Sequence, residues 1–250
     1  PLPFKLPDNQ LPKPFVLIAT TIFTKKQTTM AKALLTLAIL NLLPKFIGTK
    51  RIFLFTFLSL AIFQSAISQS INHWETIIYN DDTWSYHVPT AEPDSNWATL
   101  GYDDSAWPTG PGGFGYGDAD DNTTVSQTIS VYIRHEFNIV DTSKIAALAL
   151  HADYDDAFVA YLNGVEIARG NIDGTPPPWD ERANSNHEAP MQDGNAPEEY
   201  FASPGLLQNG NNVLAVQVHN RTPTNSDLSS NFFLSAGIVD ASNTYGAVPA

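Results

Sequence analysis

The stretch Asp153-Tyr-Asp-Asp-Ala-Phe-Val-Ala-Tyr-Leu-Asn-Gly-Val-Glu-Ile-Ala-Arg169 has the pattern of a β-hairpin. An apolar first strand, residues 158–162, is followed by Asn163-Gly164 and a return strand that begins at Val165. Asn-Gly suits a two-residue type I′ turn, because both central residues of that turn need a positive φ. Acidic side chains precede the first strand. The stretch therefore predicts a β-sandwich module and favours binding over catalysis.

Outward from this hairpin, residues 74–239 consist of short apolar or alternating runs separated by Gly, Pro, Asn and Asp clusters. This punctuation predicts an all-β fold. Period-two alternation in 131–137 and 213–219 indicates half-buried strands of two packed sheets. Residues 197–202 show the one helix-like period, a single turn at most. We expect strands at 75–79, 130–138, 146–151, 157–162, 165–169, 213–219 and 232–239.

Two segments are expected to lie outside these strands. Residues 170–212 form a long excursion rich in Pro, Asn and Gly, and a loop of this length is usually functional or disordered. Residues 240–250 have the composition of a linker, so we expect a further module downstream.

Charge is divided unevenly along the chain. Residues 1–51 hold eight of the 13 Lys and Arg and one acid, whereas residues 71–250 hold five basic and 25 acidic side chains, a formal charge of −20. Such a surface repels nucleic acid and anionic lipid, and it is compatible with neutral sugars or cations. The chain has no cysteine, which excludes disulfides and thiolate chemistry and favours a bacterial exported protein.

The N-terminal region has the pattern of a leader. Lys50-Arg51 precede an apolar run, 52–63, and then small residues at Ala66 and Ser68. This order predicts a secretory signal peptide cleaved before Gln69, and the run is short for a membrane span. We therefore expect 1–69 to be a leader, with 1–29 an upstream extension of the reading frame. The mature form is expected to be secreted or at the bacterial cell surface, without a stable membrane span.

Several motifs occur in a fixed order through residues 74–239. They are Asn96-Trp97 with Gly101-Tyr-Asp-Asp-Ser-Ala-Trp107, Gly112-Gly-Phe-Gly-Tyr-Gly117, Val131-Tyr-Ile-Arg-His-Glu-Phe137, Tyr161-Leu-Asn-Gly164, Asn209-Gly-Asn-Asn-Val-Leu-Ala-Val-Gln-Val-His-Asn220 and Ser226-Asp-Leu-Ser229. This series resembles the galactose-binding-like jelly-roll domains of secreted multidomain proteins of Bacteroidetes type, and the sugar-binding domain of family 2 glycoside hydrolases.

The resemblance implies a jelly-roll β-sandwich at 70–239 that acts as an extracellular carbohydrate-binding or accessory module of a larger protein. It is specific for fold and weakly specific for function, because one fold hosts many activities. Two alternatives stay open: a structural spacer or protein-interaction domain without a sugar ligand, and the N-terminal part of a hydrolase whose catalytic domain lies downstream.

Catalytic motifs are absent from the sequence. There is no Gly-x-Ser-x-Gly elbow, no His-Glu-x-x-His pair and no P-loop, and the six histidines have no ligand spacing. Abundant acids are no evidence of a glycosidase pair, because among 25 carboxylates some always lie close together. The chain itself is predicted not to be an enzyme, although a catalytic domain downstream stays possible.

Two acidic stretches offer the hard oxygen ligands that Ca²⁺ prefers, without the spacing of an EF-hand. The resemblance raises the expectation of a structural Ca²⁺, and the alternative is a solvated acidic turn. The candidate metal ligands are Asp118, Asp120, Asp121, Asp153, Asp155 and Asp156.

A sugar site needs aromatic platforms and polar groups for hydroxyls. Trp179, which follows three prolines in the long loop, is the preferred exposed platform, although it can equally plug the edge of the sandwich. The other tryptophans are expected in packing positions. The candidate ligand-binding residues are Tyr154, Arg169, Asn171, Trp179, His219, Asn220 and Asp227.

Overall fold

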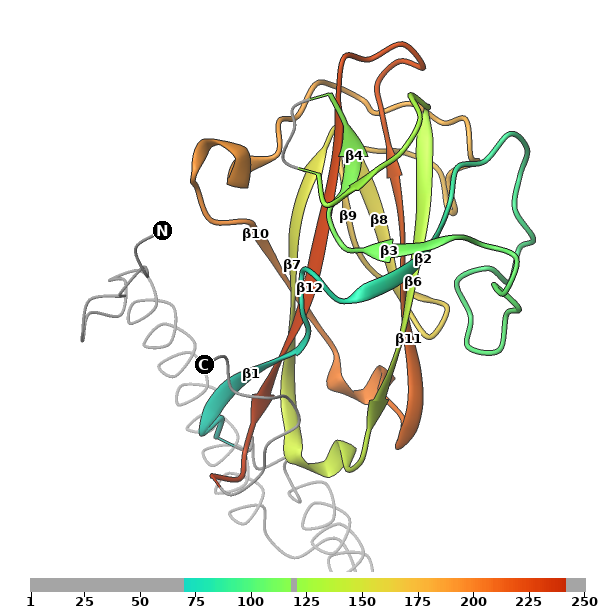
Figure 1. The fold of residues 1–250 in the computed structure, drawn as a ribbon. Helices are drawn as coiled ribbons and strands as arrows, with labels where there is room; N and C mark the ends of the chain where they lie inside the picture. Colours follow the sequence, from blue (N-terminus) through green and yellow to red (C-terminus); the bar gives the residue numbers. More distant parts are fainter. Residues whose placement is uncertain (1–69, 118–120, 242–250) are drawn as a thin grey trace, which may run out of the picture. The chain divides into compact units, whose positions relative to one another are not determined.

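A computed structural model describes residues 70–117 and 121–241, and these form two six-stranded β-sheets packed face to face (Figure 1). The leader, Asp118, Asp120 and most of the expected linker lie outside the described residues, so predictions about them stay predictions. The helical elements of the described ranges are three short 3-10 turns: η1 (Thr142–Lys144), η2 (Pro190–Asp193) and η3 (Pro204–Leu206). The all-β prediction is confirmed.

The first sheet has the strand order β10-β7-β12-β4-β5, and β1 also pairs with β12. All of these pairs are antiparallel except β4–β5, which is parallel. Its strands are β1 (His73–Ile78), β4 (Phe114–Tyr116), β5 (Thr123–Thr124), β7 (Ile145–Asp155), β10 (Glu198–Ala202) and β12 (Leu228–Ile238).

The second sheet has the order β3-β2-β6-β11-β8-β9 and is antiparallel throughout. Its strands are β2 (Thr83–His87), β3 (Thr109–Pro111), β6 (Ser130–Ile139), β8 (Ala157–Leu162), β9 (Val165–Gly170) and β11 (Gly210–His219).

The predicted hairpin is present as β8 and β9. Leu162 pairs with Val165 across the turn, and the φ angles of Asn163 and Gly164 are 53° and 83°. Both values lie in the left-handed region that a type I′ turn requires. The prediction of this turn from Asn-Gly is confirmed.

One local prediction is wrong. Residues 197–202, expected to offer at most a helical turn, contain β10, which pairs with β7 from Glu198↔Ala152 to Ala202↔Leu148. The backbone of β7, on the side away from β12, supplies the hydrogen-bond partner that the local sequence pattern does not show.

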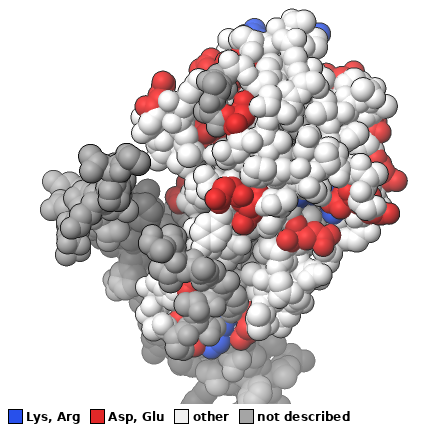
Figure 2. All heavy atoms as spheres, viewed as in Figure 1, with Lys and Arg blue, Asp and Glu red and all other residues white. Residues whose placement is uncertain are grey.

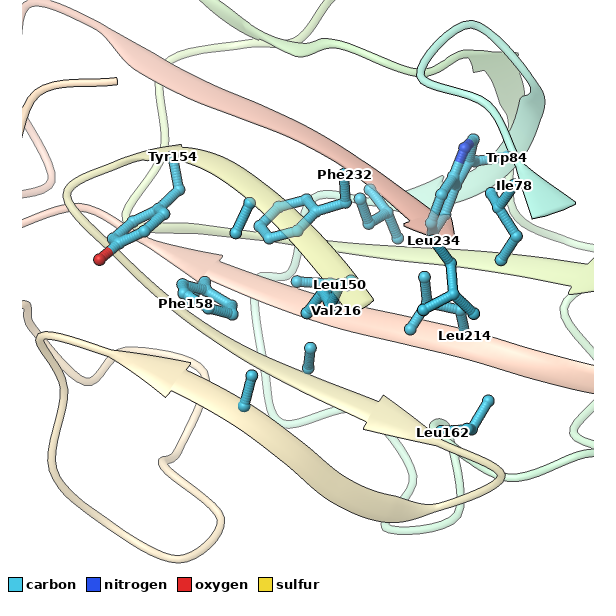
Figure 3. Packing of buried hydrophobic residues seen from close by; sticks show 14 of the residues in the cluster. Ile78, Trp84, Leu150, Tyr154, Phe158, Leu162, Leu214, Val216, Phe232 and Leu234 are labelled. Atoms are coloured by element: carbon cyan, nitrogen blue, oxygen red, sulfur yellow. The ribbon is translucent and has the colours of Figure 1, made fainter. Parts of the chain in front are cut away.

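The main core lies between the sheets. Large side chains from both sheets meet there, and Figure 3 shows Leu150 and Phe232 of the first sheet close to Phe158 and Val216 of the second. At about 25 cal/mol per Å² of buried apolar surface, such a layer is the main stabilising contribution of the fold.

The second sheet is covered on its outer face as well. Trp97, from the segment between β2 and β3, packs edge-on against Tyr132 at a ring-centroid distance of 4.6 Å and against Tyr161 at 5.6 Å. The buried Arg134 fastens this segment through the carboxylate of Asp104 and the backbone carbonyls of Trp97 and Thr99. Both faces of β6 are therefore buried along much of the strand, although its alternating sequence predicts one solvent-exposed face.

Candidate functional site

Asp156, between β7 and β8, organises the loops at one end of the sandwich. Its carboxylate accepts hydrogen bonds from the backbone N–H groups of His187 at 2.8 Å and Arg221 at 2.9 Å, and from the Asn225 side chain at 3.2 Å. The side chain is buried. Charge-assisted bonds of this kind are the stronger ones in proteins, so Asp156 ties two loops to the sheet.

Its neighbour Asp155 lies in the opposite environment. It is also buried, but no N–H donor to its carboxylate is found among the described residues, and it faces other acids. Burial first, and then the carboxylates of Asp156, Asp227 and Glu188, raise the pKa of Asp155 strongly. Such an arrangement is stabilised by a bound proton or a bound cation.

Asp155, Glu188 and Asp227 bring one carboxylate oxygen each to within 4.8 Å of one another. Three different segments supply them: the end of β7, the long loop and the turn before β12. The donor set consists of hard oxygens, which fits Ca²⁺ better than a transition metal. We call these three residues the acidic cluster.

The predicted metal ligands are only partly brought together. Asp155 lies in the acidic cluster, whereas Asp153 accepts a hydrogen bond from the backbone N–H of Met191 and Asp156 is used by the loops. Asp121 lies over Gly115 of β4. The sequence prediction missed Glu188, because no local spacing connects it to Asp155, and it assigned Asp227 to ligand binding instead.

Two of the predicted ligand residues brace the long loop. Arg169 makes a bidentate ion pair with Glu166 and donates to the carbonyls of Ile172 and Gly174. Asn171, at φ 57°, donates to the carbonyls of Asp156 and Ser185. Their geometry is that of loop anchors, and their predicted role in ligand binding stays untested.

Tyr154 is buried and belongs to a polar aromatic group at the edge of the first sheet. Its ring stacks on His187 at 4.1 Å, and its hydroxyl donates to Glu198, which also accepts from Tyr200 at 2.6 Å. Burial pushes the pKa of Glu198 upward, but hydrogen bonds from Tyr200 and His187 outweigh it and lower the pKa. Tyr154 and Tyr200 therefore both donate to the Glu198 carboxylate, and Tyr154 is buried.

The long loop crosses the outer face of the second sheet at Trp179 and Glu181, and His219 lies under this crossing. The Trp179 carbonyl accepts from Ser130 at 2.6 Å, and a ring nitrogen of His219 lies 3.0 Å from the Glu181 carbonyl. Trp179 is half-buried against the small cluster around Tyr132. The aromatic rings of Tyr154, Trp179 and Tyr200 consequently do not form one exposed concave surface.

Asn220 is fully buried beside Tyr116. Its amide donates to the Tyr116 hydroxyl at 2.9 Å and to the Thr128 carbonyl at 3.0 Å. Both bonds join the end of β11 to neighbouring strands and loops. The geometry again supports an architectural role for a residue that the sequence suggested as a ligand donor.

An exposed apolar patch lies on the outer face of the first sheet. It consists of Ile71, Trp74 and Phe201, which are 39%, 45% and 59% exposed. The Trp74 and Phe201 rings lie 6.3 Å apart, and Ile71 lies directly over Gly237. Sequence reasoning placed Trp74 among the packing tryptophans and did not single out Phe201. This patch is called the aromatic patch below.

Comparison with known proteins gives a distant structural likeness. No family model and no curated protein match the chain. A β-glucuronidase from Bacteroides uniformis is 15% identical, with 66% of this chain and 18% of that one covered at a TM-score of 0.43. For a β-glucuronidase from Bifidobacterium dentium the values are 16%, 60%, 21% and 0.40.

A glycosyl hydrolase family 2 member from Bacteroides cellulosilyticus is 13% identical, with 65% of this chain and 20% of that one covered at a TM-score of 0.39. The chain thus spans about a fifth of the length of these structures. The likeness to part of family 2 hydrolases agrees with the predicted resemblance at this coarse level only, and it does not extend their activity to this chain.

The described residues contain no helix with the length and apolarity that crossing a membrane requires.

Proposed function

We propose that the sandwich is a non-catalytic extracellular module that binds neutral carbohydrate through the aromatic patch, as an accessory part of a larger secreted or surface protein. The observation that carries this proposal is the gathering of exposed Trp74, Phe201 and Ile71 on one sheet face. Large exposed aromatic groups are costly to leave in water and typically mark a binding surface.

The surroundings of the aromatic patch support a sugar ligand. The floor between the rings is formed by small residues, since Trp74 pairs with Gly237 and Phe201 with Ala149. Beyond that floor, His151 and Ser235 share a hydrogen bond of 3.1 Å and present polar atoms on the same face. Rings for sugar C–H faces beside groups for hydroxyls are the pattern of a carbohydrate surface.

The acidic surface of the protein limits the kinds of ligand that it can bind. Acidic side chains are spread over the visible face of the molecule and basic ones are few, as Figure 2 shows. Repulsion disfavours polyanionic glycans, so the proposed ligand is a neutral polysaccharide.

Affinity electrophoresis in gels that contain neutral polysaccharides tests the proposal. The protein is expected to be retarded by at least one of them, and Trp74→Ala and Phe201→Ala are expected to weaken the retardation about tenfold or more, because each removes a stacking surface. Val140→Ala and Val165→Ala are matched controls, since both residues are exposed apolar side chains away from the patch. Equal migration of all variants in every gel would refute the proposal.

The same patch can also serve the two alternative functions. A spacer or an N-terminal part of a hydrolase would use Ile71, Trp74 and Phe201 to pack against a neighbouring domain, and inter-domain surfaces of this kind are common. The observation that favours this reading is the apolar Ile71 beside the rings. In that case the Trp74→Ala variant changes the thermal stability of the full-length protein and no polysaccharide retards it.

We also propose that the acidic cluster holds a structural Ca²⁺. The supporting observation is Asp155, a buried carboxylate that has acids around it and, among the described residues, no N–H donor. When bound, the ion supplies the positive charge that offsets three carboxylates and connects the long loop, β7 and the turn before β12. The chain contributes the oxygen ligands and the loop positions set by Asp156.

Calorimetric titration of the chelator-treated protein with Ca²⁺ tests this second proposal. At a hundredfold excess over the dissociation constant, binding stabilises by about 2.7 kcal/mol, which raises Tm by about 5–10 °C. Asp155→Asn and Asp227→Asn are expected to abolish the shift, whereas Asp193→Asn, an exposed acid on η2, retains it. No heat and no Tm shift with Ca²⁺ would contradict the proposal.

A further inference from the structure

Two buried polar atoms on the outer face of the second sheet have no partner among the described residues: the Tyr132 hydroxyl and Nε2 of His219. Both residues are 0% exposed, on the adjacent strands β6 and β11, and their ring centroids are 6.5 Å apart. Leaving a buried polar group unpaired costs about 1–3 kcal/mol. Two such groups side by side call for a common explanation.

The hydrogen-bonding character of each atom follows from its neighbours. Nδ1 of His219 lies 3.0 Å from the Glu181 carbonyl, which only accepts, so Nδ1 carries the proton. Burial lowers the pKa of His219 to about 4, so the ring is neutral at neutral pH and Nε2 is an acceptor. Burial raises the pKa of Tyr132, so its hydroxyl keeps its proton and can donate.

One donor beside one acceptor is the complement of a hydroxyl group, which both accepts and donates. A carboxylate cannot donate to Nε2, and an ammonium group cannot accept from the Tyr132 hydroxyl. The nearby charges agree, since the acids Glu92 and Asp180 act on Tyr132 and disfavour a negative ligand. The chemistry selects a neutral group that carries a hydroxyl.

Aromatic side chains lie around the Tyr132–His219 pair. Trp97 lies edge-on to Tyr132 and Tyr161, and the Tyr161 hydroxyl is 3.4 Å from the Gln217 amide. Rings that surround a few polar atoms are the common lining of small-ligand sites.

The segment Trp179, Asp180 and Glu181 forms the roof. Its attachments include the Ser130 bond to the Trp179 carbonyl, the 2.8 Å bond from the Trp179 N–H to Glu92, and the His219 bond to Glu181. Asp180 and Glu92 are exposed, so solvent lies directly above the roof. Hydrogen bonds of this kind have a net value of about 1 kcal/mol each, and local opening of such loops is common.

We infer that the Tyr132–His219 pair is a binding site for one hydroxyl of a neutral sugar, which reaches it when the roof segment lifts. This inference rests on the proposed carbohydrate function, but it uses residues on the opposite sheet from the aromatic patch. It gives the module a second subsite, selective for neutral over acidic monosaccharides.

The test follows the ring nitrogens of His219 by ¹⁵N NMR during titration of the protein with D-galactose, D-glucose, D-mannose and D-galacturonate. A neutral sugar is expected to shift Nε2 and leave Nδ1 nearly unchanged, and galacturonate is expected to have no effect. Tyr132→Phe is expected to weaken the affinity about tenfold, the value of one buried hydrogen bond. The fold of this variant is expected to persist, because the lost hydroxyl has no hydrogen-bond partner in the described part of the chain.

Tyr116→Phe is the matched control, since the Tyr116 hydroxyl is partnered by Asn220 and lies outside the site. This variant is expected to lose stability but keep the His219 response. If no sugar moves the Nε2 resonance, the pair binds an ordered water only and the inference is overturned. Equal affinity of Tyr132→Phe and the unaltered protein overturns it as well.

The Trp74→Ala variant separates the two proposals. If it loses polysaccharide retardation and His219 still responds to sugar, both proposals are supported. A response of His219 together with unaltered retardation supports the subsite and refutes the patch. Loss of retardation without any response of His219 supports the patch and refutes the subsite.

Discussion

At the scale of single residues, Asp155 and Asp156 show how adjacent identical side chains acquire different roles. Asp156 has three hydrogen-bond donors and Asp155 faces acids. The sequence identified both as candidate metal ligands. They are distinguished by residues far along the chain that loops bring in: donors around Asp156, and Glu188 and Asp227 beside Asp155. A local sequence pattern cannot contain that information, because the loops meet only in the folded chain.

Asp156→Ala is expected to destabilise the protein by about 2–4 kcal/mol, because it leaves two part-buried backbone N–H groups and the Asn225 amide without their acceptor. Asp155→Asn is expected to leave the Ca²⁺-free protein equally stable or slightly more stable, since burial and neighbouring acids raise the pKa of the Asp155 carboxyl and disfavour its charged form. Urea unfolding in the presence of a chelator measures both. Similar losses for the two variants would contradict the contrast between these residues.

A second prediction at this scale concerns how the stability of the protein depends on pH through His219. Its folded pKa of about 4 lies below the unfolded value of 6.5, so the unfolded chain takes up a proton first as the pH falls. The stability contributed by the neutral ring is complete above pH 6.5 and is lost as the pH falls toward 4, a loss of about 3 kcal/mol.

Comparison of unfolding free energies at pH 7 and pH 4.5 isolates this contribution. His219→Gln has no group that titrates at this position, so its stability is expected to fall by about 2–3 kcal/mol less than that of the unaltered protein. The other acids titrate in both proteins and cancel in the difference. Parallel pH profiles would show that His219 is not buried in the neutral form.

At the scale of elements, the hairpin was the most predictable part of the chain. Its strands and turn were predicted correctly, because Asn163 and Gly164 adopt the positive φ angles that this dipeptide favours. The sequence could not show that Asn163 also joins other segments: its amide donates to the Leu206 carbonyl at 2.9 Å, and its carbonyl oxygen accepts from the Val213 N–H at 2.9 Å.

The Asn163→Gly variant therefore tests these anchoring hydrogen bonds separately from the turn geometry. Glycine retains the turn geometry but loses these bonds, so we expect a loss of about 2–3 kcal/mol in urea unfolding. Gly164→Ala is a comparison variant that strains the turn itself, at φ 83° and with Thr99 only 2.9 Å from the new Cβ, and it is expected to cost about 1–2 kcal/mol. A neutral Asn163→Gly variant would show that the anchor bonds are dispensable.

The short strands were beyond prediction for a physical reason. β3, β4 and β5 are two or three residues long, and several of their residues are Gly or Pro. Such segments pair because of the strands that lie beside them in the folded sheet: β4 pairs with the long β12, β3 with β2 and β5 with β4. Their own composition therefore carries little β signal. The same argument applies to β10, which depends on β7.

At the scale of the whole molecule, the two sheets have different outer faces. The second sheet is covered by loops that Arg134 and His219 hold in place, whereas the first sheet exposes the aromatic patch. The sequence predicted a two-sheet sandwich with aromatic residues in its loops. It placed the exposed platform at Trp179 rather than at Trp74, because exposure depends on what other segments cover and not on the residue type.

The central claim is that the aromatic patch binds carbohydrate, and a ¹H–¹⁵N NMR titration with the neutral polysaccharide that retards the protein tests it most directly. The account predicts that the indole N–H signal of Trp74 and the backbone amide of Phe201 shift with saturation, while the amides of Val140 and Val165 stay in place. A titration that leaves Trp74 and Phe201 unchanged, or that shifts only signals on the second sheet, would contradict it.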